Sequence, residues 1–135
     1  MIEPRPSARR LANAIARAEL ARGGGEHDFD VAQRIMMRIH QELGKLLGPA
    51  GVDVLLARSV VLARRTHPVL AGITAGPDGT LAGLGEGALG GVALQEGAMA
   101  IVSHFIELLV VLIGEDLAMR LVGDVWPAAV EEGEK

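Results

Sequence analysis

The sequence predicts an all-α protein, a compact bundle of about five helices. Three observations support this fold class. Apolar residues recur at three- and four-residue spacing, Gly or Pro stands at the end of each such segment, and half of the 135 residues are apolar. The apolar residues are almost all aliphatic, since Phe29, Phe105 and Trp126 are the only aromatic residues. The core should therefore be built from Leu, Ile, Val, Ala and Met.

The first expected helix covers residues 8–22, with Ser7 as its N-cap after two prolines. Its apolar stripe is thin, and three glycines at 23–25 end it. A helix with few large apolar residues docks weakly, so residues 1–25 are interpreted as a basic arm and glycine joint. We expect this arm to be mobile or fixed by a second chain.

The main domain is expected at 26–127. An amphipathic helix at 29–47 ends at Gly48 and Pro49, and a helix at 51–66 follows directly. The 51–66 segment is apolar nearly all round, which favours a central position in the bundle. Pro68 forces its end near His67.

A glycine-rich stretch at 71–91 has eight glycines in 21 positions and is expected to be a loop. A helix that starts at about Val92 or Leu94 and runs to Ile113 follows, Gly114 breaks or kinks it, and a short helix occupies 115–125. Residues 128–135 should form an acidic tail.

The two helical pairs resemble each other when Gly48 is aligned with Gly114. Leu46 then falls on Leu112, Leu43 on Leu109 and Ile39 on Phe105. This predicts two helix–Gly–helix hairpins related by a pseudo-twofold axis. The alternative stays open, because many amphipathic helices that end in Gly can be aligned in this way.

The outward face of the 92–113 helix mixes polar residues with two valines, which is typical of an interface between subunits. The interface residues expected on this face are Ser103, His104, Glu107, Val110 and Val111. Another part of the same chain, such as the first helix or the glycine-rich loop, could cover this face instead.

Charge is divided unevenly along the chain. Residues 1–70 carry a net charge of +4 and residues 71–135 a net charge of −8. This division suits internal pairing, head-to-tail self-association or an acidic partner. A basic face is expected from Arg9, Arg10, Arg17, Arg34 and Arg38. The net charge of −4 and the lack of aromatic platforms disfavour nucleic acid as the partner.

Motifs for catalysis, cofactors and metals are missing from the sequence. His104 and Glu107 could share a metal, but two ligands do not make a site, and His40, Glu42 or Glu96 would have to come close. The glycine-rich stretch lacks the strand–loop–helix context of a phosphate site, and the serines lack an elbow motif. We therefore expect no metal, no cofactor and no enzymatic activity.

The function expected from these observations is that of a non-enzymatic interaction or adaptor module that self-associates, as a homodimer, or binds a protein partner. The 11 Arg against 2 Lys suggest a GC-rich bacterial genome, and a regulatory or signalling role in the cytoplasm fits. No membrane span is expected, because the longest charge-free apolar stretch covers only residues 108–114. The alternatives are a nucleic-acid-associated helical protein that uses the basic half, or a helical bundle that binds a small ligand or metal.

Overall fold

The computed structural model describes residues 6–21, 28–76, 81–82, 92–127 and 129. It contains helices α1 (Pro6–Ala21), α2 (Asp28–Leu47), α3 (Pro49–Thr66), α4 (Val92–Ile113) and α5 (Glu115–Val125), with a short 3₁₀ helix η1 at Pro68–Leu70. The all-α bundle of five helices is confirmed. The glycine joint at 23–25 and the acidic tail at 130–135 lie outside the described residues.

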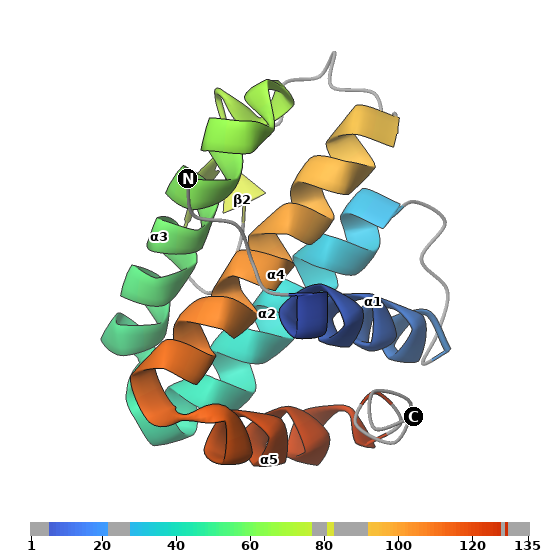
Figure 1. The fold of residues 1–135 in the computed structure, drawn as a ribbon. Helices are drawn as coiled ribbons and strands as arrows, with labels where there is room; N and C mark the ends of the chain where they lie inside the picture. The colour runs from blue at the N-terminus through green and yellow to red at the C-terminus, as the bar shows by residue number, and fades with distance from the viewer. Residues whose placement is uncertain (1–5, 22–27, 77–80, 83–91, 128, 130–135) are drawn as a thin grey trace.

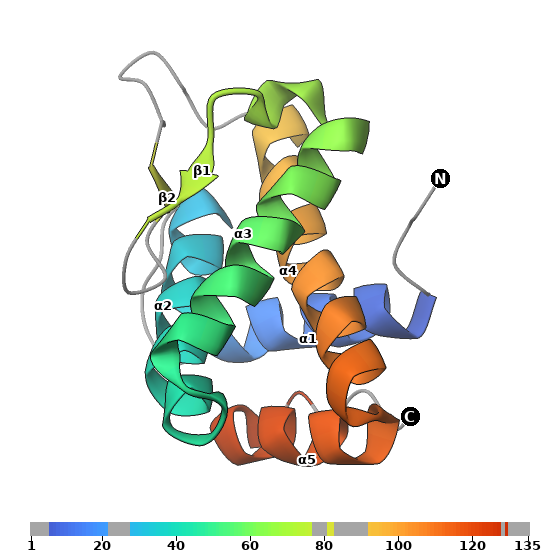
Figure 2. The same cartoon turned by 90° about the vertical axis from the view of Figure 1, so that its left-hand side faces the viewer.

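Three helices form the body of the bundle and two cross it. Figures 1 and 2 show α2, α3 and α4 side by side, with α1 and α5 lying across their lower half. Helix α4 packs against α1, α2, α3, α5 and η1 and is therefore the central element. The prediction of a central position for the 51–66 helix is wrong, because α3 exposes Val54 and Arg58 on its outer side.

The core is aliphatic, as composition predicted, with two aromatic residues added. Phe105 and Trp126 are both fully buried. Each of the five helices contributes to one continuous cluster, which includes Ile15, Ile39, Leu43, Val60, Ile101, Leu109 and Val122. One shared core means that the described helices form one packed unit.

Helix α1 packs more firmly than the sequence analysis expected. Its stripe of Leu11, Ala12 and Ile15 is buried against α4 and α2. Small alanines allow close approach of the neighbouring helices, so a thin stripe still buries a full face. The boundary at residue 25 stays a prediction, but the helix before it is part of the common core.

The two helix–Gly–helix joints have nearly the same backbone conformation. Gly48 has φ 86° and ψ 141°, and Gly114 has φ 92° and ψ 155°. Each glycine N–H donates to the carbonyl four residues earlier, and each glycine carbonyl accepts from the N–H four residues later. A positive φ with extended ψ is a conformation that essentially only glycine adopts. The hairpin prediction is therefore confirmed at both joints.

The likeness of the hairpins does not extend to their packing. Helix α3 packs along α4. A twofold axis that relates the two hairpins would place α5 along α2 in the same way. The described residues of α5 and α2 make no comparable contact. Helix α5 is also shorter than α3 and turns across the lower end of the bundle (Figure 1). The repeat is local to the joints.

The glycine-rich stretch begins with a feature that the sequence analysis did not anticipate. Strand β1 (Thr74–Ala75) pairs antiparallel with β2 (Leu81–Ala82), with Thr74 opposite Ala82. Within this stretch, residues 77–80 and 83–91 lie outside the described residues.

Candidate functional site

The predicted interface face of α4 is only partly open. Ser103 is buried and His104 is 2% exposed, because α1 and the end of α3 stand on either side of them. Both are therefore covered within the single chain, and their place in an interface between subunits stays a prediction. The alternative, that α1 of the same chain covers the face, applies to these two residues.

The remaining residues of this face differ in exposure. Glu107 and Val110 are half-buried beside Ala8 and Leu11 of α1, in a small hollow. Val111 lies beyond the reach of α1 and is 70% exposed. Of the five predicted interface residues, Val111 alone is fully exposed.

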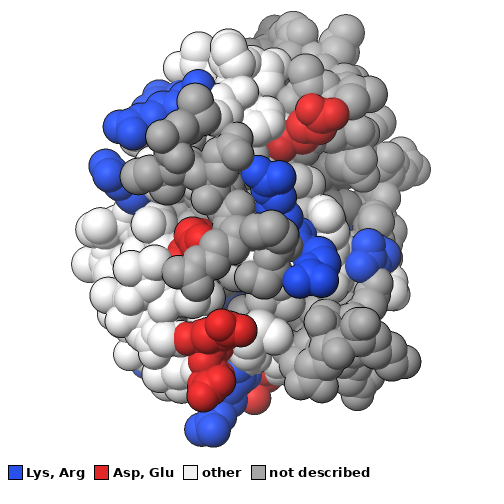
Figure 3. Space-filling view, in the orientation of Figure 1, with Lys and Arg blue, Asp and Glu red and all other residues white. Residues whose placement is uncertain are grey.

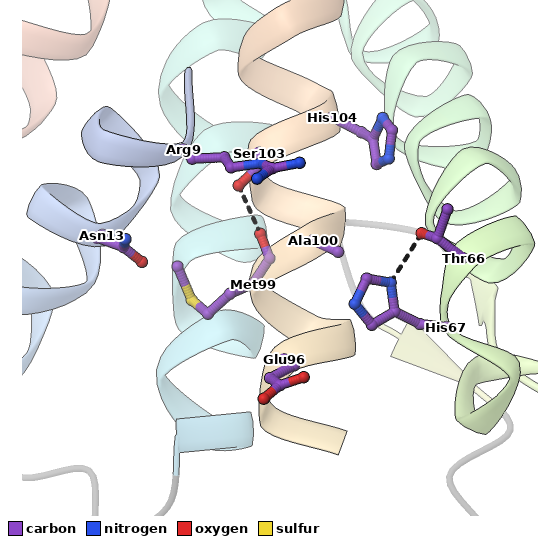
Figure 4. Close-up of a pocket in the computed structure, with 9 residues that line it drawn as sticks. All are labelled: Arg9, Asn13, Thr66, His67, Glu96, Met99, Ala100, Ser103 and His104. Carbon is purple, nitrogen blue, oxygen red and sulfur yellow. Dashed lines mark hydrogen bonds between the residues drawn. The ribbon is translucent and has the colours of Figure 1, made fainter. Parts of the chain in front are cut away.

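The covered part of the face forms the floor of a cleft of about 480 Å³ (Figure 4). Arg9 and Asn13 of α1 line one side, and Thr66 and His67 at the end of α3 line the other. The floor is a stripe of α4 with four members, Met99, Ala100, Ser103 and His104, and Glu96 lies at one end. We call this the α1–α4 cleft. Its size lies in the range of small-ligand sites.

A second surface lies at the lower end of the bundle, around the two glycine joints (Figures 1 and 2). Large apolar side chains are exposed there on α2, α3, α4 and α5, and we call them the tip surface: Leu46, Val54, Val111, Leu112 and Leu117. Figure 3 shows uncharged surface at the lower left of the molecule, with acidic side chains to its right and a basic side chain at the bottom edge. Large apolar side chains are therefore exposed near both glycine joints among the described residues.

Two members of the tip surface continue the core stripes of their helices. Leu46 follows Leu43 by three residues, and Leu112 follows Leu109 by three, so each shares a helix face with a buried residue. Nevertheless Leu46 is 66% and Leu112 is 61% exposed. The core stripe of each helix therefore extends past the part that this chain covers.

The predicted basic face divides into two groups. Arg9, Arg10 and Arg17 are exposed on α1. Arg34 and Arg38 are instead directed to the buried Glu19 carboxylate: Arg38 donates from Nε and Nη2 at 2.9 and 3.1 Å, and Arg34 Nε lies 3.5 Å away. Two of the five charges are thus paired with Glu19, and the basic face of five arginines stays a prediction.

Glu19 joins three helices. Besides the two arginines of α2, the indole N–H of Trp126, directly after α5, donates to Glu19 Oε1 at 3.0 Å. Burial acts to raise the pKa of Glu19, but hydrogen bonds from Arg38 and Trp126 and the charges of both arginines lower it below its ordinary value. The hydrogen bond with Glu19 in turn raises the pKa of Arg38.

Metal-ligating side chains are not gathered in the described residues. No group of three or more His, Asp or Glu side chains there could hold a metal ion. His40, weighed above as a ligand, instead lies 2.9 Å from Asp53 of α3 through Nε2. The described residues thus give no support to the metal-binding alternative.

Helix α4 is long and apolar enough, by length and composition alone, to cross a membrane over Glu96–Ile113. Half of this window is buried against the rest of the protein, and it includes Glu96, His104 and Glu107. The central helix of a folded bundle meets the same criterion, so this is weak evidence for a span.

Sequence reasoning missed Glu19 and most of the cleft for different reasons. Glu19 lies four residues after Ile15 on the buried stripe of α1, and an acidic residue on an apolar stripe is a readable signal. The cleft has no comparable signal, because its residues come from three separate helices. Comparisons with protein families, with characterised proteins and with solved structures give no match.

Proposed function

We propose that this protein is a non-enzymatic interaction module that self-associates, and that a second copy covers the tip surface. The observation that carries the proposal is the exposure of Leu46 and Leu112 on the core stripes of α2 and α4. Fully burying a leucine stabilises a protein by roughly 1.5–3 kcal/mol, so covering this surface offers a sizeable driving force. An ordinary interface buries about 800 Å² per partner, which is the contact size that this proposal requires.

Charges beside the tip surface favour a second copy as the partner. Lys45 is exposed next to Leu46 at the α2–α3 joint, and Arg58 is exposed one turn after Val54, in the middle of α3. Glu115 and Asp116 are exposed next to Leu112 and Leu117, at the α4–α5 joint. In a twofold dimer, the α2–α3 joint of each copy can meet the α4–α5 joint of the other, which pairs opposite charges twice.

Two further charges lie near the joints and do not change the expected pairing of opposite charges. Arg120 is exposed one turn after Asp116 on α5, and Asp53 precedes Val54 on α3. Asp53 is directed to His40, since its Oδ1 lies 2.9 Å from His40 Nε2. Asp116 and Arg120 are spaced as an i, i+4 pair. The carboxylate of Glu115 and the ammonium of Lys45 are the charges we expect to meet.

The experiment measures the mass of the full chain by sedimentation equilibrium over a range of concentrations. We expect a dimer for the wild type and a monomer for the double variant L46K/L112K, because lysine at both sites would place charge in the contact. V69K is the matched control, since Val69 is also an exposed apolar residue but belongs to η1, at the opposite end of the bundle. Circular dichroism of each variant confirms that the helices are retained.

Two results would overturn the proposal. The first is a wild-type protein that remains monomeric at high micromolar concentration. The second is a dimer that L46K/L112K leaves intact, or that V69K disrupts to the same extent as L46K/L112K. Either result would show that the tip surface is not what holds two copies together.

A further inference from the structure

The α1–α4 cleft is separate from the tip surface and has its own chemistry. It lies on the side of α4 between α1 and the end of α3, whereas the tip surface surrounds the glycine joints. Its floor contains two nearly fully buried polar side chains, Ser103 and His104. The volume of the cleft, about 480 Å³, lies in the range of small-molecule sites, and the polar groups in its floor can orient a ligand.

Opposite charges stand at the two ends of this cleft. Figure 4 shows Arg9 reaching over the floor beside Ser103, and Glu96 at the other end. Glu96 and Ser103 are seven residues apart on one helix, which separates them by about 10 Å along its axis. A simple anion would be attracted by Arg9 but repelled by Glu96, and a simple cation would meet the reverse situation.

The middle of the cleft is apolar. Met99 and Ala100 form the floor between the two charged ends, and both are half-buried. His67 faces this middle section from the end of α3, with its Nδ1 2.9 Å from Thr66 Oγ1. A methylene chain would contact Met99 and Ala100 without leaving polar groups of the ligand buried and unsatisfied.

We propose that the α1–α4 cleft binds a small amphoteric molecule with an anionic group and an amino group separated by an aliphatic chain. The anionic group lies between Arg9 and His104, where the guanidinium and the imidazole can both donate hydrogen bonds. The amino group lies at Glu96, and the aliphatic chain lies on Met99 and Ala100. This site would act independently of the tip surface.

The probe for this proposal is 8-aminooctanoate, whose carboxylate and amino group are about 10 Å apart when extended. Binding is followed by isothermal titration calorimetry and by NMR of the histidine ring protons. We expect saturable binding that shifts the ring signals of His104 and His67. Octanoate, octylamine and the shorter 4-aminobutanoate should each bind about tenfold or more weakly, since each lacks one end or the required length.

Two variants with matched controls locate the probe. R9Q and E96Q should each weaken binding by about tenfold, because each removes the charge at one end. R10Q is the control for R9Q, since Arg10 is its exposed neighbour and does not line the cleft. E115Q is the control for E96Q, because Glu115, the first residue of α5, is exposed and does not line the cleft.

Several results would overturn the proposal. The first is a lack of binding at about 10 mM 8-aminooctanoate, which would mean a binding free energy weaker than roughly 3 kcal/mol. The second is binding of octanoate or octylamine as tightly as the probe. The third is binding of the probe by R9Q and E96Q as tightly as by their control variants. L46K/L112K should bind the probe like the wild type, so failure of the dimer proposal would leave this one intact.

Discussion

Trp126 donates its indole N–H to the carboxylate of Glu19 at 3.0 Å, across 107 positions of the sequence. The same carboxylate accepts two hydrogen bonds from the guanidinium of Arg38. Glu19 is only 2% exposed, so these bonds replace the water that an ionised carboxylate otherwise requires. The contact therefore fixes the ends of α1 and α5 to the middle of α2.

The substitution E19Q should lower the free energy of unfolding by about 2 kcal/mol at pH 7, since it weakens charge-assisted hydrogen bonds. The pKa of Glu19 is lowered in the folded protein, so its ionised form stabilises the fold fully above the unfolded-chain pKa of about 4.3. This stabilisation is lost as the pH falls through the lowered folded-state pKa. The difference between wild type and E19Q should therefore shrink in acid.

Urea denaturation of both proteins from about pH 7 to pH 2 measures this difference, given the pKa range of carboxyl groups. E42Q is the control, because Glu42 contacts Lys45 at 3.4 Å on the surface and lies near Arg38 without a hydrogen bond to it, so this change should show little effect at any pH. A difference between wild type and E19Q that stays constant across the acid range would show that ionised Glu19 does not stabilise the fold.

The two glycine joints give a second prediction. G48A and G114A should each destabilise the protein by about 1–3 kcal/mol, because alanine rarely adopts a positive φ with extended ψ. G51A is the control, since Gly51 lies within α3 with open space around its Cα. It should be neutral or stabilise by up to about 1 kcal/mol through helix propensity. If G48A, G114A and G51A changed the thermal midpoint equally, the two joints would not require glycine.

Gly97 gives a third prediction, which concerns close packing. A Cβ at this position would lie 2.9 Å from Cγ and Cδ2 of Leu70, which is fully buried under α4. Overpacking costs about 1–3 kcal/mol and the gain in helix propensity is about 1 kcal/mol. G97A should therefore lower stability by about 1 kcal/mol in chemical denaturation. Adding L70V should recover part of this loss, and a G97A protein more stable than wild type would refute the contact.

Charge reversal gives a fourth prediction, on how the two copies are arranged. K45E alone or E115K alone should weaken the dimer by up to about fivefold, as expected for exposed charges. The double variant K45E/E115K should recover most of this loss, because the pair is restored with opposite polarity. Sedimentation equilibrium at low salt measures the effect, and at about 1 M salt the three variants should converge. Additive losses in the double variant would exclude the proposed joint-to-joint arrangement.

The sequence by itself determined where the helices lie. The spacing of Ile39 and Leu43 in α2, and of Phe105 and Leu109 in α4, is a property of neighbouring residues, and so is the stop that Gly48 or Gly114 imposes. The observed helix bounds differ from the expected ones by at most two residues wherever a single bound was given. Local conformation depends on local sequence, so these features were readable before any packing was known.

Only the tertiary structure decided which surfaces are covered. The burial of Ser103 and His104, the exposure of Leu46 and Leu112, and the pairing of Glu19 all depend on how α1 and α5 cross the other helices. Periodicity shows which face of a helix is apolar but not how far along its length another helix lies against it. That extent is set by contacts between residues far apart in the chain.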